Sequence, residues 1–270
     1  MSGITFATGF YVLSSKFEPE VYVQWMTNFL SIVQRFYLVI YTDEQGFSLI
    51  PSSAFKNPRI HIVVKPLTEF HGYQWKDFWI KNHKNNDLLR EKVCWEVNML
   101  WSEKLWFVLD TKKSNYFGEE TEFYGWCDIG YFRNSWNTTS TSELVNRWPR
   151  LDKLSIEKIY YANTCNDSGI MRSLIQFVQR KNAYGLPEIQ IPPNQNSIAG
   201  GFFVLSREKI QGWCDTYEKK LLLYFEHEYL VKDDQIILVD CIFTEPERFQ
   251  LIFENDVRYD NWFQFQRFLL

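Results

Sequence analysis

One short segment restricts the possible folds more than any other, the nearly all-apolar run at residues 37–42, which ends at Asp43. A strand of this kind is typically buried on both faces, as in parallel sheets. A short strand-like run at residues 4–8 precedes it, and a helix that begins at Pro19, with apolar residues at three- and four-residue spacing, separates the two. A second apolar run follows at residues 60–64. This order of strand, helix, strand and strand predicts an α/β fold with right-handed crossovers.

The rest of the chain continues the alternation of strand-like and helical patterns. Nothing in it indicates an internal repeat or a linker, so we expect a single domain over residues 1–270. The fold class predicted is α/β, with a mixed, mostly parallel central sheet flanked by helices. We predict further strands at residues 123–127, 156–162 and 199–205, helices at 88–113 (with a break near Ser102 and Glu103), 170–179, 207–230 and 234–242, and irregular structure at 67–87.

Charge, cysteine content and hydropathy exclude several classes of protein. The 29 Lys and Arg residues against 33 Asp and Glu residues give a net charge of −4 without a basic block, which does not favour nucleic-acid binding. The five cysteines are odd in number and form no CxxC pair, which indicates free thiols. The N-terminus resembles no signal peptide, and no apolar run is long enough for a membrane span, so we expect a cytoplasmic protein.

The segment Trp126-Cys127-Asp128-Ile129-Gly130-Tyr131-Phe132-Arg133 is the strongest local candidate for a site. An apolar strand brings the carboxylate of Asp128 to its C-terminal end, where ligands bind in open α/β sheets. A carboxylate there can hold Mg²⁺ or Mn²⁺ together with substrate phosphates, and Arg133 can offset diphosphate charge. The alternative is that Asp128 only caps the following turn.

Two further segments combine residue types that suit a site. Asp233 and Asp234 come just before an apolar helical run, where one carboxylate would cap the helix and the other could orient or deprotonate a hydroxyl group. Gly200 and Gly201 enter a strand, and paired glycines allow close approach to the backbone, although they also suit a tight turn. The sequence contains no GxGxxG, Walker A, HExxH, GxSxG or kinase signature.

Taken in order, these segments resemble the HtrL/YibB proteins, a glycosyltransferase-like group built on the GT-A nucleotide-sugar fold. The resemblance spans about residues 4–242. It rests on residues 5–11, 38–43, 101–104, 126–130 with Arg133, 199–203 and 233–235.

The resemblance implies a nucleotide-binding half at about residues 1–133 and a donor-sugar and acceptor half at about residues 134–270. It also implies roles for individual residues. It implies that Thr8, Tyr11 and Asp43 line the base and ribose pocket, and that Asp128 holds a metal ion, Mn²⁺ or Mg²⁺, on the diphosphate of a nucleotide-sugar donor. Gly130 stands where the family pattern has a second carboxylate. The resemblance also implies that Trp126, Lys104 and Arg133 contact the donor, and that Gly200 and Gly201 contact its sugar. It implies that Asp233 and Asp234 contact donor or acceptor hydroxyls. Asp256 or Asp260 could take the place of a late metal-binding histidine.

The sequence therefore predicts a glycosyltransferase that moves a sugar from a nucleoside diphosphate sugar, by family analogy a UDP-sugar, to a hydroxyl group of a glycan or another acceptor. Two alternatives stay open: a non-catalytic nucleotide-sugar or carbohydrate-binding protein on the same fold, and a sugar-phosphate nucleotidyltransferase. We expect the aromatic C-terminal segment, residues 262–270, to dock on the body of the protein, and an oligomer contact through it is the alternative.

Overall fold

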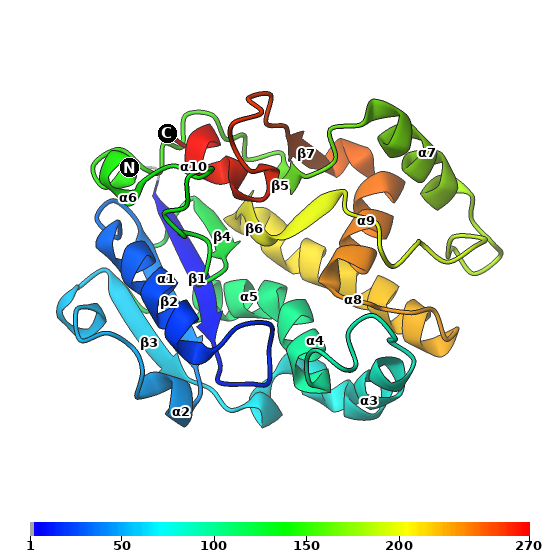
Figure 1. Cartoon of the computed structure of the whole chain (residues 1–270), viewed down its shortest axis with the longest axis horizontal. Coiled ribbons are helices and arrows are strands. Elements are labelled where there is room, and N and C mark those ends of the chain that lie inside the picture. Colours follow the sequence, from blue (N-terminus) through cyan, green and yellow to red (C-terminus); the bar gives the residue numbers. More distant parts are fainter. Residues whose placement is uncertain (1–2) are drawn as a thin grey trace.

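A seven-stranded sheet forms the centre of the computed structural model, which describes residues 3–270 (Figure 1). The strands lie in the order β3-β2-β1-β4-β6-β5-β7. Their bounds are β1 Ile4–Phe10, β2 Tyr37–Thr42, β3 Ile60–Val64, β4 Phe123–Cys127, β5 Ile159–Asn163, β6 Ile198–Ser206 and β7 Phe249–Ile252.

Strand directions confirm the predicted mixed, mostly parallel sheet. Strands β1 to β4 are parallel to their neighbours among themselves, and β5 is parallel to β7. Only β6 runs against both of its neighbours, β4 and β5. The carboxyl ends of β1 and β4 therefore lie at one edge of the sheet, beside the first residues of β6. Strands from both predicted halves of the chain belong to this one sheet, while the division into halves stays a prediction.

Helices cover both faces of the sheet (Figure 1). Helices α4, α5, α8 and α9 contribute to the hydrophobic cluster on one face, and α1 and α10 to the cluster on the other. None of the helices within residues 3–270 is long and apolar enough to cross a membrane. The helix bounds are α1 Pro19–Ser31, α2 Glu44–Phe47, α3 Lys76–Lys84, α4 Trp95–Ser102, α5 Lys104–Ser114, α6 Thr141–Leu144, α7 Ser168–Gln179, α8 Ile210–Glu226, α9 Asp234–Thr244 and α10 Gln264–Phe268.

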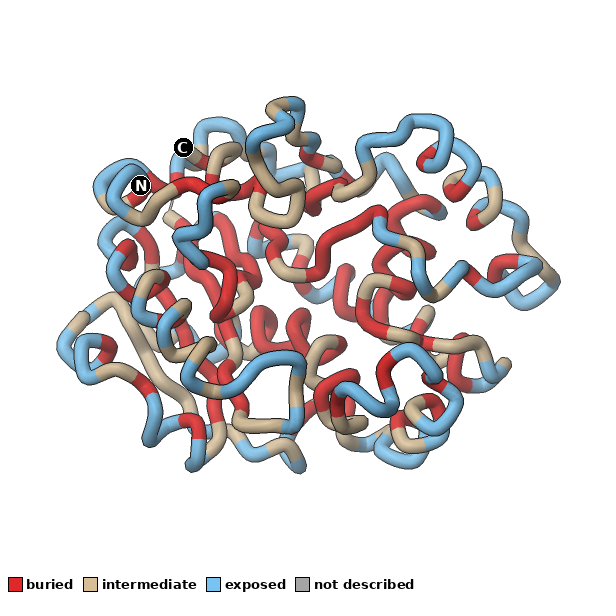
Figure 2. Tube along the Cα trace, in the orientation of Figure 1, coloured by how far each residue is buried: buried red, intermediate tan, exposed pale blue. Residues whose placement is uncertain are grey.

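Alternating residues of the central strands supply the two halves of the core. Phe6 and Leu38 point to the face covered by α1, whereas Ala7 and Val39 point to the face covered by α5. All four are fully buried, and Figure 2 shows the inner strands as continuously buried segments. The prediction that residues 37–42 are buried on both faces is confirmed, because β2 has a strand on each side and helices above and below.

The structure departs from the predicted secondary structure at residues 67–87 and in two short elements. Residues 67–87 are not irregular, since α3 lies within them and is fixed by Asn82, which exchanges hydrogen bonds with the backbone of Val231. The glycine pair lies inside β6, within the strand predicted at 199–205, which removes the alternative of a tight turn. The short elements β7 and α10 were not predicted, because each has too few residues to show a period.

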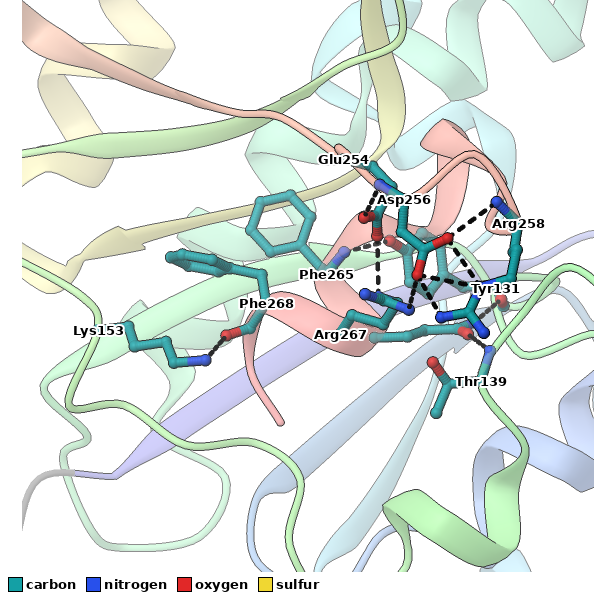
Figure 3. A network of polar contacts seen from close by, with 10 residues as sticks. Tyr131, Thr139, Lys153, Glu254, Asp256, Arg258, Phe265, Arg267 and Phe268 are labelled. Carbon is teal, nitrogen blue, oxygen red and sulfur yellow. Dashed lines mark hydrogen bonds and ion pairs between the residues drawn. The ribbon is translucent and has the colours of Figure 1, made fainter.

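The C-terminal segment docks on the body of the protein, as predicted. Phe265 and Leu269 are completely buried. The side chain of Gln266 donates to the backbone oxygen of Tyr131 at 2.8 Å and accepts from the backbone nitrogen of Thr139 at 3.0 Å. Figure 3 shows Tyr131 and Thr139 in the network of polar contacts to which this segment belongs. Helix α10 thus fixes the segment that follows β4. The main apolar residues of the C-terminal segment therefore pack inside the molecule. An oligomer contact through that segment stays a prediction.

Candidate active site

A cleft of about 430 Å³ opens at the carboxyl ends of β1 and β4. Its walls come from the loop after β1, from α4 and the first residue of α5, from the segment after β4, from the glycine pair of β6, from the start of α9 and from the loop before α10. This is the position at which open α/β sheets bind ligands. Eleven of the candidate site residues named from the sequence line it: Tyr11, Lys104, Trp126, Asp128, Gly130, Arg133, Gly200, Gly201, Asp233, Asp234 and Asp260.

Asp128 is the most accessible of the three carboxylates at the centre of the cleft. It follows β4 directly, and its backbone nitrogen donates to the carbonyl oxygen of Gly201 at 2.8 Å. One carboxylate oxygen accepts a hydrogen bond from the indole nitrogen of Trp126 at 2.5 Å. The side chain keeps 44% of its surface exposed, so Asp128 can still meet a ligand. It makes no side-chain hydrogen bond to the turn that follows, within the part of the chain described, which removes the capping alternative.

Lys104 lies between two of these carboxylates. Its ammonium nitrogen is 3.3 Å from Asp128 and 3.1 Å from Asp234, and it donates to the carbonyl oxygen of Gly200 at 2.8 Å. The break between α4 and α5 at Glu103 places this lysine at the first position of α5, facing the sheet edge. Burial alone would lower the pKa of Lys104, but the carboxylates of Asp128 and Asp234 outweigh it and raise that pKa above its ordinary value.

The two carboxylates at the start of α9 are both buried, and each faces a lysine. Asp233 occupies the N-cap position but makes no side-chain capping hydrogen bond, and instead pairs with Lys232 at 2.8 Å. Asp234 is held by Lys104, so the prediction that one of these two carboxylates caps the helix was wrong for the residues described. Asp234 pairs with Lys104, and burial raises its pKa to about 6, although the lysine opposes that rise. A carboxyl group with this pKa is ionised at neutral pH and can accept a proton.

The glycine pair in β6 makes room for these same carboxylates. A Cβ atom on Gly200 would lie 2.5 Å from a carboxylate oxygen of Asp234, and one on Gly201 would lie 3.1 Å from a carboxylate oxygen of Asp128. The sequence reasoning, that something must approach this backbone closely, was correct. The approaching groups are side chains of the protein itself, and contact with a donor sugar at Gly200 and Gly201 stays a prediction.

Gly130 has a different reason for lacking a side chain. Its Cβ would lie 2.7 Å from a ring carbon of Trp25, whose indole covers this turn. A second carboxylate could not stand at position 130 unless that indole moved.

The acidic residues of the cleft do not fit a divalent cation of the usual kind. Asp128 shares its carboxylate with Trp126 and Lys104, and Asp234 is held by the same lysine. Within residues 3–270 no group of three or more His, Cys, Asp or Glu side chains is close enough to hold a metal ion. Asp260 lines the cleft, but it accepts from the backbone nitrogen of Trp262 at 2.9 Å. The predicted Mn²⁺ or Mg²⁺ ion thus has one accessible carboxylate, with an ammonium group beside it.

Arg133 stands at the aromatic side of the cleft. Its guanidinium lies 4.2 Å from the ring centre of Trp25 and 5.1 Å from that of Phe263, which indicates cation–π contacts. One nitrogen, Nε, donates to the carbonyl oxygen of Gly130 at 3.0 Å. Among residues 3–270 no carboxylate pairs with this guanidinium within 4.0 Å, so its terminal nitrogens are available to an anion.

Two of the predicted base and ribose contacts do not line the cleft. Thr8 is completely buried within β1. The carboxylate of Asp43 accepts from the backbone nitrogen of Gly46 at 2.6 Å and caps α2. Tyr11 does line the cleft, but its hydroxyl group donates to the carbonyl oxygen of Lys65 at 3.0 Å. The structure thus separates the residues predicted to form this pocket.

Several residues of the cleft were missed in the sequence. Lys16 lies in the loop after β1, and its ammonium group is 4.9 Å from the ring centre of Trp101, which also lines the cleft. Phe17 and Trp262 add further aromatic surface. The position of Lys16, shortly after the carboxyl end of the first strand, was a usable signal, whereas the aromatic residues could not be told from core residues.

Comparisons with known proteins show a distant structural likeness. No family model matches the chain, and no curated protein matches it in sequence. The chain is similar to the crystal structure of mouse xyloside xylosyltransferase 1 in its apo form, with a TM-score of 0.43 and 11% sequence identity, over 93% of this chain and 84% of the other. The HtrL/YibB resemblance of the sequence stays a prediction, and so does its cytoplasmic location.

Proposed function

We propose that this protein is a glycosyltransferase that moves a sugar from a nucleoside diphosphate sugar to an acceptor hydroxyl group. One observation carries the proposal: a cleft at the carboxyl ends of parallel strands brings together Asp128, Lys104 and Asp234, with an available guanidinium, that of Arg133, at its side. These groups can stabilise a departing anion and accept a proton. The sequence resemblance supports the same class of reaction.

The reaction requires stabilisation of the departing diphosphate. The bond between the sugar carbon and the diphosphate oxygen breaks, and the diphosphate leaves with the bonding electron pair, so cations close to it lower the barrier. Arg133 is the cation in the cleft best placed for this role, because its terminal nitrogens are available and its position is fixed by Trp25 and Gly130.

The acceptor oxygen forms the new bond and must lose its proton. In an inverting reaction Asp234 would take that proton, since burial raises its pKa to about 6 and the carboxylate is ionised above that pH. Lys104 would hold this carboxylate in place at 3.1 Å. In a retaining reaction the same carboxylate would hold a sugar hydroxyl group.

A further hydrogen-bond acceptor in the cleft favours a polyhydroxylated ligand. One carboxylate oxygen of Asp233 is buried and has no hydrogen-bond partner within the described residues, although the residue lines the cleft. A buried acceptor without a partner is costly, and a ligand hydroxyl group would satisfy it. The ion pair with Lys232 involves only the other carboxylate oxygen of Asp233.

The experiment that tests the proposal has two stages. A thermal-shift panel of nucleoside diphosphate sugars, with UDP-sugars first, should identify a donor that stabilises the protein. Release of nucleoside diphosphate is then measured for the wild type, for Asp234→Asn and for the control Asp215→Asn, which changes an exposed aspartate on α8. We expect Asp234→Asn to lower turnover at least tenfold and the control to leave it unchanged. Equal turnover in all three proteins would refute the role of Asp234.

A non-catalytic nucleotide-sugar or carbohydrate-binding protein is the second candidate. The position of Trp25 favours this second candidate, because its indole leaves no room at position 130 for the second carboxylate of the family pattern. Binding of a nucleotide sugar without release of nucleoside diphosphate, in the presence of varied acceptors, would support this candidate. Release of pyrophosphate from a nucleoside triphosphate and a sugar phosphate would instead identify a nucleotidyltransferase.

A further inference from the structure

The ammonium group of Lys104 occupies the place between two carboxylates that a bound cation would otherwise take. It forms ion pairs with Asp128 at 3.3 Å and Asp234 at 3.1 Å, and it donates a hydrogen bond to the carbonyl oxygen of Gly200 at 2.8 Å. Two carboxylates and one carbonyl oxygen thus surround this ammonium group. Its side chain is only 8% exposed, so solvent does not compete for these contacts. The protein therefore carries a cation of its own at the centre of the cleft.

The surroundings of Lys104 do not favour adding a divalent ion. The ion would have to share Asp128 with this ammonium group, and like charges at that distance repel. Trp25 fills the space in which a side chain at position 130 would supply a second ligand. Asp233, the remaining buried carboxylate, already pairs with Lys232.

Two cations at the rim are available to a ligand. Arg133 and Lys16 line the cleft, and neither lies within 4.0 Å of a carboxylate oxygen in residues 3–270. By contrast, the lysines deeper in the cleft region, Lys104 and Lys232, already have carboxylate partners. An anion entering the cleft would therefore meet Arg133 and Lys16 first.

We propose that the cleft binds the diphosphate of a nucleotide without a divalent cation, using Arg133 and Lys16 as direct contacts and Lys104 as a fixed charge behind them. The proposal rests on the proposed function, because it specifies how the same site meets the charge of the donor. It replaces the metal ion of the sequence prediction with side chains of this chain.

The test measures nucleotide binding to the full-length wild type by isothermal titration calorimetry. The probes are UDP, GDP, ADP, CDP and dTDP, each titrated once with excess EDTA and once with Mn²⁺. We expect at least one of them to bind, with a Kd that changes less than about threefold between the two conditions. A Kd that tightens more than about tenfold with Mn²⁺ would overturn this inference and leave the proposed function intact. The absence of binding by all five nucleotides in both conditions would contradict the proposed function itself, and this inference with it.

Two variants test which side chains supply the charge. With EDTA present, Arg133→Gln and Lys16→Gln should each weaken binding about tenfold or more, since each removes a charge-assisted hydrogen bond. Lys219→Gln is the matched control, because Lys219 is an exposed lysine on α8. Thermal unfolding of each variant establishes that it is folded. If folded Arg133→Gln and Lys16→Gln bind as tightly as Lys219→Gln, the assigned contacts are wrong.

Discussion

Replacing Asp234 by asparagine should make the protein more stable at neutral pH, although we expect it to remove the proposed proton acceptor. Burial raises the pKa of this carboxyl group from its ordinary value of 3.8 to about 6 in the folded protein. The folded state therefore binds the proton more tightly than the unfolded state. The stability that this group contributes is fully present below pH 3.8 and is lost as the pH rises through 6.

The size of the effect follows from the two pKa values. One pKa unit corresponds to about 1.4 kcal/mol, so the ionised carboxylate costs on the order of 3 kcal/mol of unfolding free energy at pH 7.5 and only a small fraction of that at pH 4. Asparagine resembles the protonated acid in shape and cannot ionise. The attraction of Asp234 to Lys104 is already contained in this difference, because it acts on the same pKa. The variant should therefore exceed the wild type in stability by an amount that grows from pH 4 to pH 7.5.

Urea unfolding of both proteins at several pH values between 4 and 7.5 measures this difference directly. Titrating groups distant from Asp234 cancel, because they have the same surroundings in both proteins. Asp233→Asn is the control, since it removes the same charge one residue away and leaves the contacts of Lys104 in place. A stability difference that does not change with pH, or a variant less stable than the wild type at pH 7.5, would refute the reasoning.

Three further predictions concern the surroundings of the cleft. Gly130→Ala should lower the unfolding free energy by about 1–3 kcal/mol, since its Cβ would lie 2.7 Å from Trp25, and the double variant with Trp25→Leu should recover part of that loss in urea unfolding. Gly200→Ala should displace the Asp234 carboxylate, because the new Cβ would lie 2.5 Å from one of its oxygens. Calorimetry should then detect weaker binding of any nucleotide sugar identified in the thermal-shift panel, and an unchanged affinity would contradict this. Gln266→Leu removes two buried hydrogen bonds to the segment after β4 and should cost about 2–4 kcal/mol in urea unfolding, whereas a loss below about 0.5 kcal/mol would show that α10 does not fix this segment.

Local composition determined the framework of this protein. Residues 37–42 are apolar at every position but the last, and only a strand covered on both faces can bury such a run. The same reasoning gave the strand before Asp128, and the three- and four-residue spacing of apolar residues gave the helix that begins at Pro19. Parallel strands end at a common edge of a sheet, so the sequence also predicted that the carboxyl ends of these strands lie beside one another. The sequence could therefore indicate that Asp128 lies at this edge of the sheet.

Tertiary structure decided which residues meet there and what they do to one another. Lys104 and Asp234 are 130 positions apart in the sequence, and only the packing of α5 and α9 against the sheet edge brings them to 3.1 Å. Trp25 excludes a side chain at Gly130 through a contact that no local pattern encodes. Burial and charge pairing depend on neighbours that are distant in the chain, so the sequence alone could propose a metal-binding carboxylate but could not reveal that a buried lysine already lies beside it.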